Sequence, residues 1–193
     1  MKMVEFDFST FPTLTTSRLI LREIIPTDAA DLFSFHSDPE VQKYDSDPPM
    51  REIAEAVFLI EKITQWFTSG QAISWGIAFK EENRLIGGLG FYFWGKVYYK
   101  TELGYTVARP YWRRGIAAEA VRALMQFGFE TLHLHRINAD TRMDNLASVR
   151  LMQKLGFRHE GVRRECIWNE DGTYQSWGLY GMLEDEYRAL SAL

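Results

Sequence analysis

The chain has 193 residues, 46% of them apolar and 15% aromatic, and carries 22 Lys and Arg against 26 Asp and Glu. A chain of this size hides roughly 70% of its unfolded surface on folding, which excludes a mainly disordered protein. Its net charge of −4 lacks the broad cationic face that nucleic acid or an anionic membrane requires, so we expect neither as a direct partner.

Several features of the chain bear on its compartment and domain count. The longest apolar run, residues 56–60, is far below the ~18 residues of a membrane-spanning helix. The N-terminal MKMVEFDF carries acids where a signal peptide would be apolar. Cys166 is alone, so no intramolecular disulfide or cysteine metal cluster can form. We therefore expect a cytoplasmic protein with one domain over residues 1–193, including an N-terminal arm over 1–13.

The spacing of apolar residues predicts a mixed α/β order of elements. Up to residue 107 the expected elements are a strand over 18–24, a short helix from 26–28 to about 37–39, an amphipathic helix over 50–69 closed by Gly70, and strands over 72–79, 84–94 and 100–107, with turns at 80–83 and 95–96. Beyond it they are a turn over 110–115, a helix over 116–132, a strand over 136–141, a helix from 144–145 to 155, and two β runs around the turn 170–172. Antiparallel hairpins thus come early and a βαβ-like passage comes late.

A strand runs directly into a helix through a turn that contains Gly115. The first N–H groups of a helix have no intrahelical acceptor and lie at the positive end of its dipole, so a phosphate can bind them. Gly115 keeps a Cβ out of that approach. Residues 109–122 hold four arginines against Glu119 alone. The pattern predicts a pyrophosphate site, with an ordinary loop of solvated arginines as the alternative; no Gly-Lys-Ser/Thr follows, which excludes a nucleotide-hydrolase P-loop.

A second segment, residues 140–157, places Asn145 at a helix start and Ser148 on the same side of its first turn. In isolation this pattern is a helix cap followed by an ordinary helix.

In this order, and 30 positions apart, the segments around Gly115 and Asn145 resemble those of the GNAT superfamily of acetyl-CoA-dependent N-acetyltransferases. That family's turn motif, Gln/Arg-x-x-Gly-x-Gly/Ala, is matched at Gly115 and Ala117, but its first position is Trp112 here. The segments that resemble the ribosomal-protein N-terminal alanine and serine acetyltransferase branch are 14–23, 111–112, 117–120, 145–148 and 160–165. The resemblance spans residues 14 to 187.

The resemblance implies an α/β fold in which about seven strands form a mixed, mostly antiparallel sheet with a splayed parallel pair, flanked by about four helices. The parallel pair would be 100–107 and 135–142, with acetyl-CoA in the V-shaped split between them. Its pyrophosphate would bind the amides of residues 114–118, and its pantetheine arm would pair with Val107 and its neighbours. The residues assigned to acetyl-CoA in this way are Val107, Ala108, Arg109, Arg113, Arg114, Gly115, Ile116, Ala117, Ala118, Asn145 and Ser148.

The resemblance also implies catalytic roles. A backbone amide near Val107 would stabilise the oxyanion formed from the thioester carbonyl. Glu102 occupies the position where many members carry a general base, with an outward-facing strand charge as the alternative and Asp140 as a further candidate. Many relatives donate to the leaving thiolate from a tyrosine, but that position is Met152 here, so Ser148 is the expected donor rather than a plain helix serine.

The expected acceptor is a primary amine, first of all the α-amine of a ribosomal or other protein N-terminus. A polyamine or aminoglycoside is the alternative, and a catalytically silent acyl-CoA-binding domain is a third, favoured only by Trp112 and Met152. We expect no metal: His133 and His135 would share a face if 133–139 were extended, but lack a third ligand. A monomer and a homodimer fit the sequence equally, and the choice of aromatics that line the acceptor pocket stays open.

Overall fold

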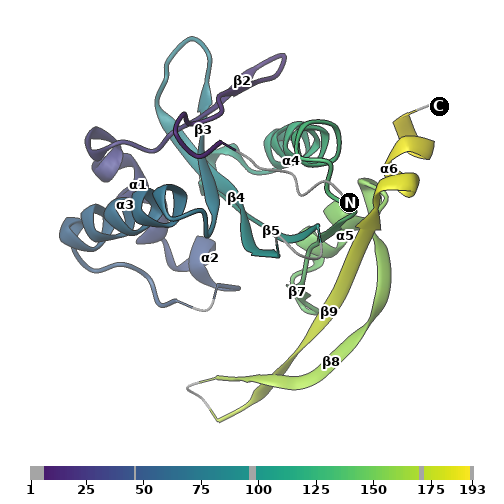
Figure 1. The fold of residues 1–193 in the computed structure, drawn as a ribbon. Helices are drawn as coiled ribbons and strands as arrows, with labels where there is room; N and C mark the ends of the chain where they lie inside the picture. The colour runs from purple at the N-terminus through teal and green to yellow at the C-terminus, as the bar shows by residue number, and fades with distance from the viewer. Residues whose placement is uncertain (1–6, 46, 96–98, 170–171, 192–193) are drawn as a thin grey trace.

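The computed structural model describes residues 7–45, 47–95, 99–169 and 172–191. Its sheet runs in the order β1-β2-β3-β4-β5-β6-β9-β7, and β8 pairs with β9 (Figure 1). The strands are β1 Leu14–Thr15, β2 Leu19–Arg22, β3 Ile73–Phe79, β4 Leu85–Gly95, β5 Lys100–Val107, β6 Arg136–Asn138, β7 Thr141–Arg142, β8 Arg158–Trp168 and β9 Tyr174–Leu183. The α-helices are α1 Ala29–His36, α2 Pro39–Gln42, α3 Ile53–Thr68, α4 Ile116–Gln126, α5 Leu146–Lys154 and α6 Glu184–Ser191.

The sheet confirms the predicted fold class, because within the described residues β5 and β6 are its one parallel pair and the other pairs are antiparallel. It has nine strands rather than about seven, since β1 adds one and the run expected over 136–141 breaks into β6 and β7. The expected turns at 95–96 and 170–172 involve Lys96, Glu170 and Asp171, which lie outside the described residues.

The described residues form six α-helices rather than about four. Two of these helices, α2 and α6, were not expected from the sequence. The first is a single turn that begins at Pro39, where the side chain of Asp38 accepts from the Glu40 N–H. The second opens with three acids, which favour the positive end of a helix dipole. The helix expected over 116–132 ends as α4 at Gln126 and continues as a π-helical turn over Phe127–Thr131.

Helices cover both faces of the sheet. Figure 1 shows α1 and α3 on one side of β3 and β4, and α4 on the other. The larger apolar cluster includes Trp75, Phe91 and Ile116, and the smaller one, under α1 and α3, includes Phe35 and Ile60. The β8–β9 hairpin extends away from these layers (Figure 1). The larger cluster includes Leu103 and Val107 of β5 and so fixes one face of that strand against the core.

The described part of the N-terminal arm packs on the core. The rings of Phe8 and Phe11 lie 5.4 and 4.9 Å from that of Phe67, and Trp75 Nε1 donates to the Pro12 carbonyl at 2.5 Å. Residues 8–12 are therefore part of the fold. None of the helices in the described segments is both long and apolar enough to cross a membrane.

Candidate active site

The parallel strands β5 and β6 part after a short stretch of pairing. Their register runs from Lys100 opposite Arg136 to Glu102 opposite Asn138. After that point β7 pairs with β9, while β5 continues beside β4 to Val107. No described strand pairs with residues 103–107 on the side away from β4. The result is a V-shaped opening between the two strands, as the family resemblance implied.

The backbone of Val107 faces this opening. Val107 lies opposite Gly87 on β4, and the next residue, Ala108, donates its N–H to the Ile86 carbonyl at 2.9 Å. Bonded and non-bonded pairs alternate along an antiparallel ladder, so the N–H and C=O of Val107 point away from β4. Both backbone groups of Ala108 are engaged within the protein, because its carbonyl accepts from the Tyr111 N–H at 3.0 Å.

The side chain of Trp112 forms a hydrogen bond with the carbonyl of Val107. Its indole Nε1 donates to that oxygen at 2.6 Å, which leaves the Val107 N–H as the donor directed into the opening. Trp112 stands where the family motif has Gln or Arg, and all three side chains carry an N–H donor. The departure from the motif therefore preserves a hydrogen-bond donor at this position, which the sequence analysis did not anticipate.

The turn after β5 ends in the N-terminus of α4. Gly115 is the N-cap with φ of +74°, and the Glu119 N–H donates to its carbonyl at 3.0 Å. The N–H groups of residues 116–118 precede this first helical bond. A Cβ at Gly115 would meet only Arg18 Nη2, at 3.6 Å, so there is space for a side chain. The fold favours glycine at this position because the φ angle is left-handed. Arg113 and Arg114 are exposed beside these amides.

Glu119, one turn into α4, is bound by the segment before β2. It accepts from Thr16 Oγ1 at 2.5 Å, from the Arg18 N–H at 2.9 Å and from Arg18 Nε at 2.7 Å, and Arg18 Nη1 also donates to the Arg114 carbonyl at 3.1 Å. Burial alone would raise the pKa of Glu119, but these hydrogen bonds outweigh it and lower the pKa to about 2. We call residues 16–18 with Glu119 the α4 clamp; it holds the turn in place.

The side chain of Arg109 forms an ion pair away from the N-terminus of α4. Its Nε lies 3.3 Å from Asp38 Oδ2, at the start of α2. This ion pair connects the turn after β5 to the N-terminus of α2.

Glu102 shares a sheet face with Tyr92 and Asn138, its partners in register on β4 and β6. It is half-buried, and its pKa is raised by burial and by the nearby charge of Asp140, while Arg163 opposes this. A carboxylate with a raised pKa is a better proton acceptor, which suits a general base.

The Tyr92 ring forms a wall beside Glu102. A Cβ at Gly90 or Gly104 would come within 3.0 Å of the ring atoms, so these two glycines give the ring its space. Ser74 Oγ donates to the Tyr92 oxygen at 3.4 Å, and burial raises the pKa of the phenol. Tyr92 therefore stays neutral and fixed on the same face as the candidate base.

Tyr105 lies three residues after Glu102, so its side chain points to the opposite face of β5. Its hydroxyl donates to Ser148 Oγ at 3.0 Å. Burial raises the pKa of Tyr105, and the bond to Ser148 lowers it in part. Ser148 also donates its N–H to Asn145 Oδ1 at 3.2 Å, which makes Asn145 the N-cap of α5. Met152, one turn further on, is 1% exposed and belongs to the core.

The structure thus places Glu102 on one face of β5, where β6 still pairs, and Ser148 on the other face through Tyr105, with Val107 and the turn into α4 at the far end of the strand. It adds three contacts that the sequence analysis missed: Tyr105 with Ser148, Trp112 with Val107, and residues 16–18 with Glu119. Strand alternation could have placed Tyr105 on the face opposite Glu102. It could not have indicated Ser148 as the partner of Tyr105, because Ser148 lies 43 positions away.

The histidines do not form the arrangement considered for a metal. His133 has φ of +51°, and β6 begins only at Arg136, so residues 133–135 are not an extended run. No three or more His, Cys, Asp or Glu side chains of the described segments are grouped to hold a metal ion.

Comparison with known proteins gives a consistent result. A family model described as an acetyltransferase (GNAT) domain matches residues 18–158. The uncharacterized N-acetyltransferase YoaA of Bacillus subtilis (strain 168) is 35% identical over 174 residues, which cover 90% of this chain and 98% of that protein. The ribosomal protein uS5-alanine N-acetyltransferase of Escherichia coli (strain K12) is 26% identical over 165 residues, covering 80% and 82%.

Solved structures share the fold. A GNAT-family acetyltransferase from Bacillus anthracis matches with a TM-score of 0.80 and 25% identity, over 90% of this chain and 99% of that one. The microcin C7 self immunity acetyltransferase MccE, in complex with acetyl-CoA and AMP, matches with a TM-score of 0.79 and 19% identity, over 87% and 93%.

Proposed function

Because the chain belongs to the GNAT family of N-acetyltransferases, we propose that it transfers the acetyl group of acetyl-CoA to the α-amine of a protein N-terminus. The observation that carries this proposal is the parting of β5 from β6 immediately before the turn into α4. The opening exposes one strand edge to an extended ligand, and the turn offers amides and arginines to a phosphate at the end of that edge.

The parts of acetyl-CoA can be assigned along this path. The pyrophosphate binds the turn over 113–118, where Gly115, the amides of Ile116, Ala117 and Ala118, and the two exposed arginines Arg113 and Arg114 gather. The pantetheine arm runs along β5, and the thioester carbonyl accepts from the Val107 N–H. Ala108 and Arg109 contribute less, because the backbone of one and the side chain of the other are engaged inside the protein. Asn145 acts through its cap of the helix that carries Ser148.

The chemistry follows from the two faces of β5. The neutral amine attacks the thioester carbon, and its nitrogen gives up a proton to Glu102 through bound water, because Glu102 lies five residues before Val107 on β5. The negative charge on the carbonyl oxygen is stabilised by the Val107 N–H. When the intermediate collapses, the C–S bond breaks and Ser148 donates a hydrogen bond to the leaving sulfur from the other face. The products are the N-acetylated acceptor and CoA, and no step uses a metal.

Two observations support an α-amine as acceptor. An α-amine has a pKa near 8, against about 10.4 for lysine, so a single carboxylate base is sufficient. The Escherichia coli relative is named for acetylation of an N-terminal alanine of a ribosomal protein. The lone, exposed Cys166 suits a reducing compartment, so we place this activity in the cytoplasm.

The test offers acetyl-CoA to the purified protein with four acceptors: a peptide with a free N-terminal alanine or serine, the same peptide N-terminally blocked but containing lysine, spermidine, and an aminoglycoside. Free CoA is measured with a thiol reagent and the acetylated atom by mass spectrometry. We expect transfer to the free peptide N-terminus. Transfer confined to the small amines would refute the acceptor, and acetyl-CoA binding without CoA release from any mixture would show a silent binding domain.

A further inference from the structure

A second carboxylate lies close to Glu102. Asp140 stands at the break between β6 and β7, two residues after Asn138, which is the partner of Glu102 in register. Its side chain is only 14% exposed, and its charge acts on that of Glu102. Asp140 therefore follows directly on the part of β6 that pairs with Glu102.

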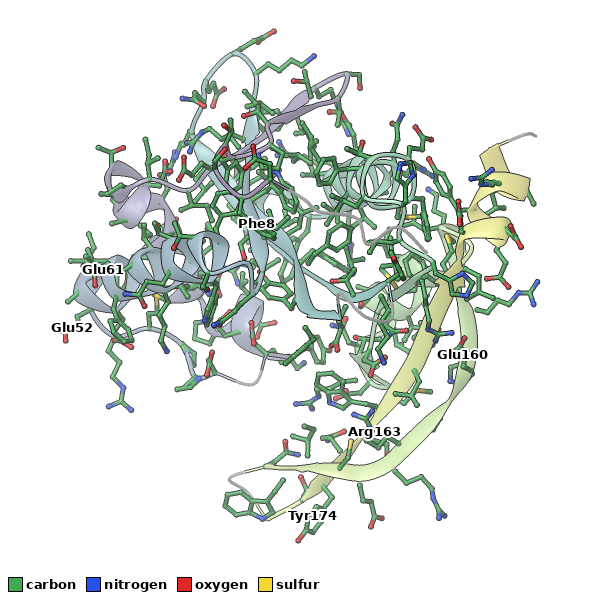
Figure 2. The ribbon with its side chains drawn as sticks, viewed as in Figure 1. Phe8, Glu52, Glu61, Glu160, Arg163 and Tyr174 are labelled. Atoms are coloured by element: carbon green, nitrogen blue, oxygen red, sulfur yellow. The ribbon has the colours of Figure 1, made fainter. Side chains whose placement is uncertain are left out.

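One cation faces this pair. Arg163 of β8 has its Nη2 3.9 Å from Asp140 Oδ2, at the outer limit of an ion pair, and its side chain is 60% exposed. Figure 2 shows Arg163 partway along the hairpin, between Glu160 and Tyr174. An exposed ion pair at this distance neutralises a carboxylate only weakly.

The other charged groups around Asp140 balance each other. Arg136 of β6 and Glu160 of β8 form an ion pair across β9, and the remaining neighbour, Tyr180, contributes a backbone hydrogen bond to Asp140. Burial raises the pKa of both Glu102 and Asp140, while Arg163 lowers both. Two carboxylates against one loosely held guanidinium leave one uncompensated negative charge in a half-buried site.

We propose that Asp140 and Glu102 together bind the acceptor as an alkylammonium ion, with Asp140 as the residue that holds the ammonium and Glu102 as the group that removes its proton. The inference rests on the proposed function and adds the charge state in which the acceptor is selected. An α-amine of pKa near 8 is mostly ammonium at pH 7, so the site captures the abundant form. Two protons leave the ammonium in all: the first passes to Glu102 and the freed electron pair forms the bond to the acetyl carbon, and, as the C–S bond breaks, the second passes from the nitrogen to the leaving thiolate.

The experiment measures binding without turnover. The protein is saturated with CoA, and a peptide with a free N-terminal alanine is titrated into it by calorimetry at pH 7; the N-acetylated peptide is the uncharged comparison. We expect the wild type to bind the free peptide and Asp140→Asn to bind it ~10-fold more weakly, the loss of one partly buried charge contact. Asp144→Asn is the matched control, because that carboxylate lies after β7 and pairs with Arg142, and it should bind like the wild type.

A second variant keeps the test valid if Asp140→Asn does not fold. Arg163→Gln keeps both carboxylates and removes their cation, so the free peptide should bind more tightly. NMR titration of the Glu102 carboxyl group supplies a readout without any acceptor: its pKa should fall in Asp140→Asn and rise in Arg163→Gln. Equal binding by wild type and Asp140→Asn, equal binding of the free and acetylated peptides, or an unchanged Glu102 titration in both variants would overturn the inference. Peptide binding without acetyl transfer from acetyl-CoA would instead refute the proposed function alone.

Discussion

The hydroxyl of Tyr105 donates a 3.0 Å hydrogen bond to Ser148 Oγ and so joins β5 to α5. Because Ser148 Oγ accepts this bond, its own hydrogen remains available to a third group. The bond from Tyr105 also stabilises negative charge that develops on Ser148 Oγ. In the proposed mechanism that third group is the sulfur of CoA. The pair would then act as one unit, with Tyr105 as the positioning residue.

Tyr105→Phe should therefore lower kcat by ~10-fold and leave the affinity for acetyl-CoA nearly unchanged, because the contact matters when charge develops on sulfur. Ser148→Ala should lower kcat by ~10-fold to 100-fold at all pH values. Since the two residues act through one hydrogen bond, the double variant should be no slower than Ser148→Ala. Steady-state kinetics and calorimetry measure these effects. Losses that multiply in the double variant would show that Tyr105 acts independently of Ser148.

Glu102→Gln separates the base from the leaving-group contact by its pH dependence. Burial and Asp140 raise the pKa of Glu102, so the wild-type rate should fall as pH drops through that raised value, when the carboxylate becomes protonated. The variant should be slowest relative to the wild type between that raised pKa and the pKa of the amine, where Glu102 is ionised and the amine is mostly ammonium, and it should recover in part near the pKa of the amine, where no base is required. A pH–rate profile parallel to that of the wild type would assign the base to another group, with Asp140 or a bound water as the next candidates.

The sequence could predict the parts of the site that depend on neighbouring residues. Gly115, the first amides of α4 and the cap of α5 by Asn145 are local signals, and β alternation puts Glu102 and the strand residues around it on defined faces. The pairing partners could not be predicted, because the two residues of each contact lie far apart in the chain: 43 positions for Tyr105 and Ser148, and 103 for Thr16 and Glu119.

The break between β6 and β7 also escaped the sequence analysis. Residues 136–141 alternate like one continuous strand, but Ala139 donates its N–H to the Tyr180 carbonyl between the two short strands. The local pattern holds no sign of this, since it arises from the way β9 pairs with β6 and β7 in turn. Asp140 lies at this break.

The α4 clamp should give Glu119 a measurable role in stability. Its pKa of about 2 lies below the ordinary value of 4.5, so its ionised form stabilises the fold above pH 4.5 and this contribution is lost as pH falls toward 2. Glu119→Gln should lower the unfolding free energy at pH 7 by about 2 kcal/mol, the scale of hydrogen bonds to a charged group. It should also weaken acetyl-CoA binding, because Arg18 holds the Arg114 carbonyl in the turn.

The difference between wild type and Glu119→Gln should shrink as pH falls below 4.5, which denaturation at several pH values would reveal. Glu184→Gln is the control, since Glu184 pairs with Arg188 on the exposed side of α6, and it should change neither quantity by much. A stability loss in Glu119→Gln that does not vary with pH would contradict the ionic account of the clamp.

Gly115 and Gly172 both have left-handed φ angles, of +74° and +82°, and a Cβ would have room at either position. Gly115→Ala and Gly172→Ala should therefore carry the same backbone strain, about 1 kcal/mol. Only Gly115 lies at the turn proposed to bind the pyrophosphate; Gly172 is in the β8–β9 hairpin.

We expect Gly115→Ala to weaken acetyl-CoA binding by at least ~10-fold and Gly115→Val to abolish it, because the first amides of α4 lose their alignment and a Cβ enters the phosphate's approach. Gly172→Ala should lose similar stability with unchanged acetyl-CoA affinity. Calorimetry and thermal denaturation of the three variants measure both quantities, and unchanged binding by Gly115→Val would place the pyrophosphate elsewhere.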